Sequence, residues 1–173
     1  MERPAAVTVD VEYDERYWYP DDGGEVWLAG YQVVDPVSGS YLARDAPALA
    51  ERGLRVAGVA GAARHHAAAL DADALAPGHP LELRRDPGNP HDPNAIAVFP
   101  SGGGAAERAG WVPREVAVEL AGDLDAGRPW AAVVLREQRA SPRAPRSGLT
   151  MLLARGEAIA LRERGGRRGR AAR

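Results

Sequence analysis

Short apolar runs separated by turn residues divide this sequence, and that division limits the fold more than any other feature. From Val7 to Tyr13, apolar residues alternate with polar ones, as they do in a strand with one buried face. A turn of Asp and Gly at residues 21–24 separates this run from a second one at residues 26–34, which predicts a β-hairpin. Further strands are predicted at residues 54–59, 81–85, 95–99, 108–112, 130–135 and 149–153. The pattern therefore predicts a mainly β protein.

Helices are predicted at three places between these runs. Residues 45–52 favour a short helix weakly, and the Ala-rich segment at residues 62–75 favours one by propensity. The segment after Pro113 is amphipathic, because apolar residues recur every four positions on one face up to Leu124. The three strands predicted between residues 81 and 112 have no helix between them, which indicates a meander.

Charge is distributed unevenly along the 173 residues. Residues 1–51 carry eleven acidic residues and three arginines, whereas residues 136–173 carry three acidic residues and eleven arginines. The length fits one domain with appendages. We expect an acidic N-terminal β-hairpin extension at residues 1–53, a central domain at residues 54–160 and a disordered, Arg-rich tail at residues 161–173.

The composition excludes several kinds of site. The chain has no cysteine, which excludes disulfide bonds, thiolate zinc sites and cysteine nucleophiles. The adjacent His65 and His66 would point in different directions on a helix and cannot chelate one ion together. Because the sequence also has no recognised ligand spacing, neither a metal site nor a cofactor is predicted. No apolar run is long enough to span a membrane, and residues 1–19 show no secretory signal. These features favour a cytoplasmic protein without a membrane partner.

The most unusual segment joins two of the predicted strands. It reads Arg-Arg-Asp-Pro-Gly-Asn-Pro-His-Asp-Pro-Asn at residues 84–94 and is too long for a tight hairpin turn. Its three prolines restrict the backbone, so little conformational entropy is left to lose on binding. Such a loop can present Asn, His, Asp and Arg side chains to a ligand. Alternatively, Asn and Asp satisfy local backbone groups in Asx turns, and the spacing does not distinguish the two interpretations.

Three ordered motifs resemble those of the HIRAN domain family. They are an opening strand with a glycine at residues 56–59, the block Arg-Asp-Pro-x-Asn-Pro-x-Asp-x-Asn-Ala-Ile-x-Val at residues 85–98, and Gly-x-Val-Pro-Arg at residues 110–114 before a helix. The resemblance covers about residues 54–160. It implies a mainly β, α+β fold: a small, OB-like, partly open β-barrel with two helices, to which the N-terminal β extension and the disordered basic tail are attached.

The resemblance also implies a function. HIRAN domains occur fused to chromatin-remodelling helicases and as small stand-alone bacterial proteins. This sequence resembles the stand-alone kind, because it contains no lysine with which to make a P-loop. We therefore expect a non-enzymatic module that binds single-stranded DNA at its 3′-hydroxyl end, in DNA repair or replication-fork processing. A separately encoded helicase or nuclease is the expected protein partner.

The resemblance assigns roles to residues of the matching motifs. Asp92 is the expected acceptor of a hydrogen bond from the 3′-hydroxyl, with Asn89 and His91 beside it at the terminal nucleotide. Arg114 is expected to contact a phosphate, and Trp111 to line the pocket. The candidate DNA-binding residues are Arg85, Asn89, His91, Asp92, Trp111 and Arg114.

Two other functions remain open at this point. The chain departs from the eukaryotic family members at Ala60, Gly61 and near Leu149, where those relatives carry aromatic residues that stack on bases. The pocket would then be vestigial in a protein-interaction adaptor that docks its partner through the acidic front or through residues 17–19, a Tyr-Trp-Tyr cluster otherwise expected to cap the barrel. A hydrolase using Asp92 and His91 is the least favoured interpretation, because no nucleophile, base and orienting group are found together.

Overall fold

The computed structural model describes residues 5–19, 24–62, 72–102 and 107–164. The chain begins with the predicted hairpin, in which β1 (Ala6–Trp18) pairs antiparallel with β2 (Val26–Val33). A short helix, α1 (Pro47–Glu51), begins with a proline and buries Leu49. It leads into β3 (Leu54–Gly58), the first strand of the segment expected to form the central domain.

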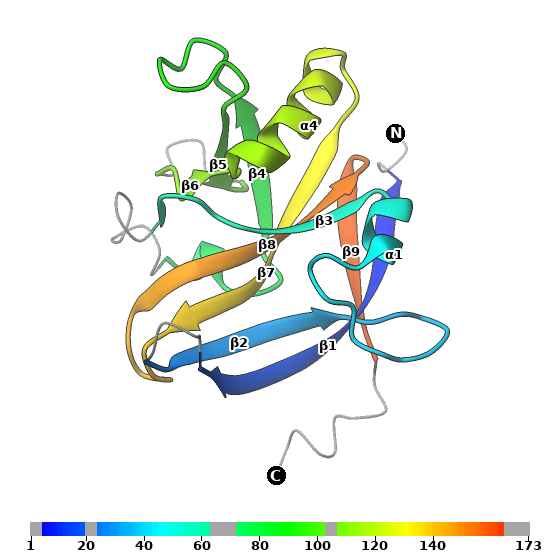
Figure 1. Ribbon diagram of the computed structural model, residues 1–173, viewed down its shortest axis with the longest axis vertical. Coiled ribbons are helices and arrows are strands. Elements are labelled where there is room, and N and C mark those ends of the chain that lie inside the picture. Colours follow the sequence, from blue (N-terminus) through cyan, green and yellow to red (C-terminus); the bar gives the residue numbers. More distant parts are fainter. Residues whose placement is uncertain (1–4, 20–23, 63–71, 103–106, 165–173) are drawn as a thin grey trace.

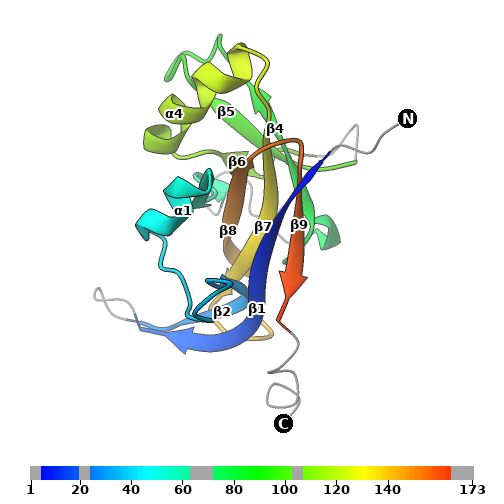
Figure 2. The same ribbon diagram turned by 90° about the vertical axis from the view of Figure 1, so that its right-hand side faces the viewer.

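The predicted meander follows a short 3₁₀ turn, η1 (Asp73–Leu75). Its strands are β4 (Pro80–Arg85), β5 (Ile96–Pro100) and β6 (Gly110–Trp111), and β5 pairs antiparallel with both of the others. Helix α4 (Arg114–Asp125) begins directly after Pro113 and buries Ala117, Leu120 and Ala121. The two helices belong to different core clusters, since α4 packs with Met151 and Leu153 of the later strands and α1 packs with the intervening Leu152; Figure 2 shows α4 above α1.

Strands β7 (Trp130–Arg139), β8 (Arg146–Arg155) and β9 (Ala158–Glu163) complete the sheet. Its order is β6-β5-β4-β7-β2-β1-β9, and β8 lies between β7 and β3. Only the pairing of β9 with β1 is parallel among the described strands. Strand β7 connects the two halves of the molecule, because β4 pairs with its first part and β2 with its last part (Figure 1).

The sheet does not close into a continuous barrel. Strands β3, β8, β7, β4, β5 and β6 follow one another around the central domain. Between the end of β3 and β6 there is one isolated bridge, in which the Ala60 N–H donates to the Trp111 carbonyl at 2.8 Å and the Trp111 N–H donates to the Ala60 carbonyl at 2.9 Å. The fold is therefore partly open, and its open edge is the boundary between β3 and β6, which this single bridge joins.

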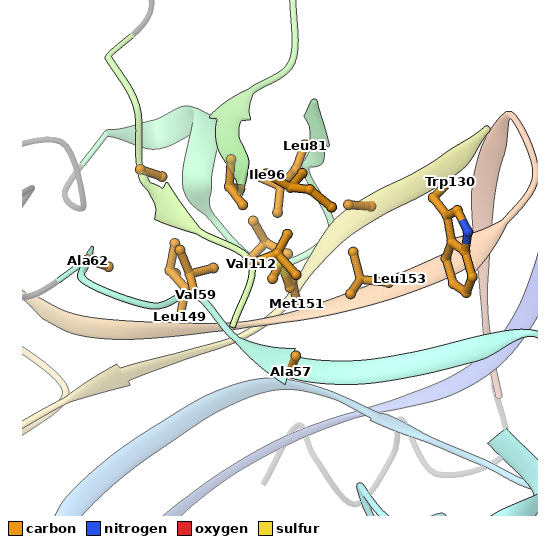
Figure 3. Packing of buried hydrophobic residues seen from close by; sticks show 14 of the residues in the cluster. Ala57, Val59, Ala62, Leu81, Ile96, Val112, Trp130, Leu149, Met151 and Leu153 are labelled. Carbon is orange, nitrogen blue, oxygen red and sulfur yellow. The ribbon is translucent and has the colours of Figure 1, made fainter. Parts of the chain in front are cut away.

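Strands β7 and β8 bury side chains on both of their faces. On β8, Met151 and Leu153 join a cluster with residues of β4, β5 and α4, part of which is drawn in Figure 3. The intervening Leu152 joins a second cluster with residues of the hairpin and α1. A strand buried on both faces carries a continuous apolar run. This burial explains why residues 149–153 lack the alternation seen in β1.

The expected fold class, mainly β with two α-helices, is confirmed. Some predicted boundaries are wrong. The predicted strand at residues 108–112 is confined to Gly110–Trp111, and β7 and β8 extend beyond the predicted runs. The disordered tail does not begin at residue 161, because residues 161–163 finish β9 by pairing with β1. Most of the helix predicted at residues 62–75, and the rest of the tail, lie outside the described residues.

The prediction that residues 17–19 cap the barrel is also wrong. Tyr17, Trp18 and Tyr19 are 40%, 49% and 67% exposed at the end of the hairpin, away from both core clusters. Tyr17 packs edge-to-face on Trp27 of β2, with the ring centroids 5.0 Å apart. No helix in the described ranges is both long and apolar enough to span a membrane.

A buried carboxylate attaches the end of β9 to the hairpin. The Asp10 side chain is 5% exposed and accepts hydrogen bonds from Arg162 Nε at 2.7 Å and from Arg164 Nη1 at 3.2 Å. The bond from Arg162 is the main cause that lowers the pKa of Asp10 below its ordinary value, despite burial. Two arginines of the expected tail are thereby part of the folded structure.

Replacing Asp10 with asparagine should lower the melting temperature by a few degrees at pH 7. The folded-state pKa of Asp10 is depressed, so its stabilising contribution is present above the unfolded pKa and is lost as the pH falls through the folded pKa. Thermal unfolding of wild type and Asp10→Asn should therefore differ most near neutral pH and converge as the pH falls below about 4. A difference that did not depend on pH would contradict this role.

Candidate nucleic-acid interface

The loop between β4 and β5 is held by its own side chains. Asn89 Oδ1 accepts hydrogen bonds from the backbone N–H groups of His91 at 2.9 Å and Asp92 at 3.2 Å. Asp92 Oδ1 accepts one from the Asn94 N–H at 2.9 Å. The Asp86 N–H donates to the Ala95 carbonyl at 2.9 Å and closes the base of the loop. These hydrogen bonds are the Asx turns that were the alternative to ligand binding for this loop. They occupy Asn89 Oδ1 and one oxygen of Asp92.

Arg85 does not lie with the other candidate residues. Its Nε and Nη2 donate to the two carboxylate oxygens of Asp125 at the end of α4, at 2.9 and 3.1 Å, and its Nη1 donates to the Ala95 carbonyl at 2.9 Å. The hydrogen bond from Arg85 lowers the pKa of Asp125. Arg85 therefore joins the base of the loop to α4, and its side chain lines none of the pockets described below.

The other five candidate residues line one pocket of about 270 Å³. It lies where the open edge of the sheet meets the loop between β4 and β5. Figure 1 shows that loop next to α4. The loop, β6 and the first residue of α4 contribute its walls, together with Ala60 after β3. Its lining residues are Ala60, Asn89, His91, Asp92, Ala95, Trp111, Val112 and Arg114.

Asp92 and Arg114 form the polar side of this pocket. The Asp92 side chain is 16% exposed, and its Oδ2 lies 3.7 Å from Arg114 Nε. Arg114 Nη2 donates to the His91 carbonyl at 2.9 Å, and its side chain is 72% exposed. Arg114 follows Pro113, so its guanidinium lies at the positive end of the α4 dipole. The pocket thus offers a recessed carboxylate next to an exposed cation.

Trp111 supplies an aromatic wall that a neighbouring arginine supports. The Arg108 guanidinium lies over the Trp111 ring, 4.4 Å from its centroid. Such a cation–π contact restrains the ring. Neither Arg108 nor the wall residue Ala95 is recognisable from the sequence as part of a site, because neither has a chemical feature that separates it from other arginines and alanines in the chain.

A second, shallower hollow of about 510 Å³ lies on the other side of Asp92 and is lined by residues of the same loop and of α4, including Arg114. Across the described ranges, no three His, Asp or Glu side chains gather as metal ligands would. His65 and His66 lie outside those ranges.

Comparison with known proteins identifies the class of this domain. The model of the HIRAN domain family matches residues 54–144, which is more than half of the chain. The protein therefore belongs to the HIRAN domain family, as its motifs indicate. HIRAN domains are DNA-binding modules.

One solved structure is similar to part of the chain. It is the crystal structure of the HIRAN domain of human HLTF, with a TM-score of 0.43 and 25% sequence identity, covering 61% of this chain and 78% of that one. No curated protein matches the sequence significantly.

Proposed function

We propose that this protein binds single-stranded DNA and holds a 3′-hydroxyl end in the pocket around Asp92. The observation that carries the proposal is the meeting of Asn89, His91, Asp92, Trp111 and Arg114 in one pocket, although they come from a loop, a strand and a helix. The family to which the chain belongs supports a nucleic-acid ligand. The 3′-end preference rests on the chemistry of the pocket.

The Asp92 carboxylate suits a hydroxyl better than a phosphate. Its Oδ1 is engaged by the Asn94 N–H, whereas its Oδ2 is 3.7 Å from Arg114 Nε, which is beyond hydrogen-bond distance. Oδ2 therefore keeps the capacity to accept a hydrogen bond from a hydroxyl group. A terminal phosphate would place like charges next to each other in a recessed site, which is unfavourable.

The remaining residues suit the last nucleotides of the strand. The exposed Arg114 guanidinium is placed to contact a backbone phosphate, aided by the α4 dipole. Trp111 and His91 offer ring faces on which a base can stack, and stacking contributes about 1 to 3 kcal/mol per base. Ala60 adds no such platform at the open edge, so Trp111 carries most of the stacking in this pocket.

We assign the protein no catalytic step, because a binding module explains the residues of the pocket. Its place is in DNA repair or at replication forks in the cytoplasm of a bacterial cell, where free 3′ ends arise. There it would act with a separately encoded helicase or nuclease that processes the end it holds.

A panel of labelled oligonucleotides tests this function directly. Fluorescence anisotropy should give the highest affinity for strands with a 3′-hydroxyl, a lower one for the same strands with a 3′-phosphate, and the lowest for substrates in which only a 5′ end is free. Equal affinity for all three would contradict end recognition. Equal affinity of DNA and RNA strands would leave the end preference intact and widen the ligand class.

Replacing Arg114 with alanine should lower affinity for every single-stranded end by about 1 to 3 kcal/mol, since a charge-assisted phosphate contact is lost. The melting temperature should change little, because the side chain is 72% exposed and its contact with Asp92 is a long, solvent-exposed ion pair. Anisotropy and thermal unfolding of the same preparation check both parts. Normal binding, or unfolding several degrees earlier, would make Arg114 a structural residue.

A protein-interaction adaptor is the second candidate function. It is favoured by the exposure of Tyr17, Trp18 and Tyr19 at the tip of the hairpin. A folded protein that bound no strand of the panel would support it over DNA binding.

A further inference from the structure

A further polar pocket, distinct from the two hollows around Asp92, lies on the other side of the segment that follows β3. Ala60 lines the Asp92 pocket, whereas its neighbours Gly58, Val59, Gly61 and Ala62 line a pocket of about 580 Å³. The rest of that pocket is formed by Arg44, Gln138 and residues 147–150 at the start of β8. The two pockets therefore share one narrow wall of small residues.

The strand register places further arginines on the same face of the sheet as this pocket. Thr150 pairs with Gly58 on one side and with Arg136 on the other, and Arg136 pairs with Gly30 of β2. Residues paired directly across strands project from the same face. Along β1, Asp14 is opposite Gly30 and Arg16 is two residues further on, so the Arg16 side chain shares this face. The row crosses β1, β2, β7, β8 and β3, which Figure 1 shows side by side.

The positive charges on this face are poorly compensated. Arg136 Nη1 donates to the Tyr31 carbonyl at 2.8 Å and to Gln32 Oε1 at 3.3 Å, and both acceptors are neutral. Among the described residues, neither Arg44 nor Arg136 forms an ion pair, while Arg16 Nε lies 3.6 Å from Asp14 Oδ2. Burial, and then the charges of Arg44 and Arg16, lower the pKa of Arg136 to about 10, although the charge of Asp14 acts in the opposite direction. The group remains protonated at neutral pH, so a bound anion would relieve this repulsion.

Small residues line this pocket, because Gly58 and Gly148 present no side chain to it. Gly30 lets β2 approach β7 closely beside Arg136, since a Cβ at Gly30 would overlap the backbone of Leu135 and Arg136. Arg16 and Arg44 precede the part of the chain that matches the family model, whereas Arg136 lies within it, so the N-terminal extension supplies two of the three arginines.

We propose that Arg44, Arg136 and Arg16 form a second phosphate site, which binds the backbone of a DNA strand whose 3′ end lies in the Asp92 pocket. The proposal rests on the proposed function and extends it. A strand that leaves the Asp92 pocket over Ala60 would enter the pocket that Gly61 and Arg44 line, because Ala60 and Gly61 are consecutive residues and each lines one of the two pockets. The N-terminal extension thereby lengthens the DNA path beyond the end pocket.

Arg44→Gln tests this site without disturbing the fold, since Arg44 is exposed and has no ion pair with a described residue. The control is Arg128→Gln, which removes an exposed arginine between α4 and β7 that pairs with Asp123. Affinities are measured for strands of about 4 to about 16 nucleotides, the range of OB-fold site sizes. Each length is used with a 3′-hydroxyl and with a 3′-phosphate.

Arg44→Gln should weaken the longest strands about threefold to tenfold and lower the slope of log affinity against log salt by about 0.7, the contribution of one phosphate on a single strand. The shortest strands and the Arg128→Gln control should change much less. The loss should be the same for 3′-hydroxyl and 3′-phosphate ends, because Arg44 contacts the backbone and not the end. Arg16→Gln should give a smaller loss in the same direction, since Asp14 already compensates part of its charge.

The outcomes separate this site from the end pocket. Wild-type affinity of Arg44→Gln for long strands, or an equal loss at every length, would overturn the second phosphate site and leave end recognition standing. A length-dependent loss without any 3′-hydroxyl preference in the wild type would overturn end recognition and leave the phosphate site standing. If the wild type bound no strand at all, both would fall.

Discussion

Asp92→Asn should abolish the preference for 3′-hydroxyl over 3′-phosphate ends. Affinity for hydroxyl ends should fall by about 1 to 3 kcal/mol, which is roughly fivefold to 150-fold, because a charged acceptor is replaced by a neutral one. Affinity for phosphate ends should rise, because the negative charge that repels them is gone. Anisotropy with both ends measures the two changes in one experiment.

The asparagine variant separates binding from folding. Its side-chain carbonyl can still accept the hydrogen bond from the Asn94 N–H that orders the loop, so the melting temperature should stay close to that of the wild type. Glu157→Gln is the matched control, since it removes an exposed carboxylate on the turn between β8 and β9. An end preference that survives in Asp92→Asn would show that another group reads the 3′ end.

Gly110→Ala should destabilise the protein by about 1 to 3 kcal/mol, the usual cost of adding a group to a packed site. A Cβ at this position would lie 2.5 Å from the Ala60 carbonyl oxygen and 2.6 Å from Val59 Cγ1. The Ala60 backbone cannot move away without loss of the two hydrogen bonds that join it to Trp111. Urea denaturation monitored by tryptophan fluorescence measures the free energy of unfolding.

The same substitution should weaken DNA binding, because Trp111 follows Gly110 and lines the Asp92 pocket. Gly122→Ala on α4 is the matched control. A Cβ there would meet nothing within 4 Å, and replacing a helical glycine should stabilise the protein by about 0.5 to 1 kcal/mol. If Gly110→Ala were as stable as the wild type, the close approach of β6 to the end of β3 would be wrong.

Local features of the sequence were sufficient to predict several elements. Alternation predicted the β1–β2 hairpin, and the proline before a four-residue apolar period predicted α4. The ordered motifs predicted the family, which the family model confirms. Five of the six candidate residues share a pocket in the structure, and their role in binding DNA stays a prediction.

Other features depend on residues that are far apart in the chain, and no local pattern reveals them. Arg85 has the charge and the hydrogen-bond donors of a residue that contacts DNA. Its guanidinium instead donates to Asp125, which lies forty positions further along the chain. Residues 161–163 lack an apolar period, but their backbone finds partners along β1. Exposed backbone edges pair with any strand that comes alongside, so such an element cannot be recognised before its partner is placed.

The conformation of the loop that carries Asn89 and Asp92 follows from local sequence, because prolines and Asx turns restrict a backbone through neighbouring residues alone. What lies opposite that loop depends instead on contacts between residues that are far apart in the chain. The approach of Trp111 to Ala60, and the gathering of Arg16, Arg44 and Arg136 on one face, follow from strand register. Register is set by the burial of whole strands, since a shift of one residue would move every side chain to the other face of the sheet.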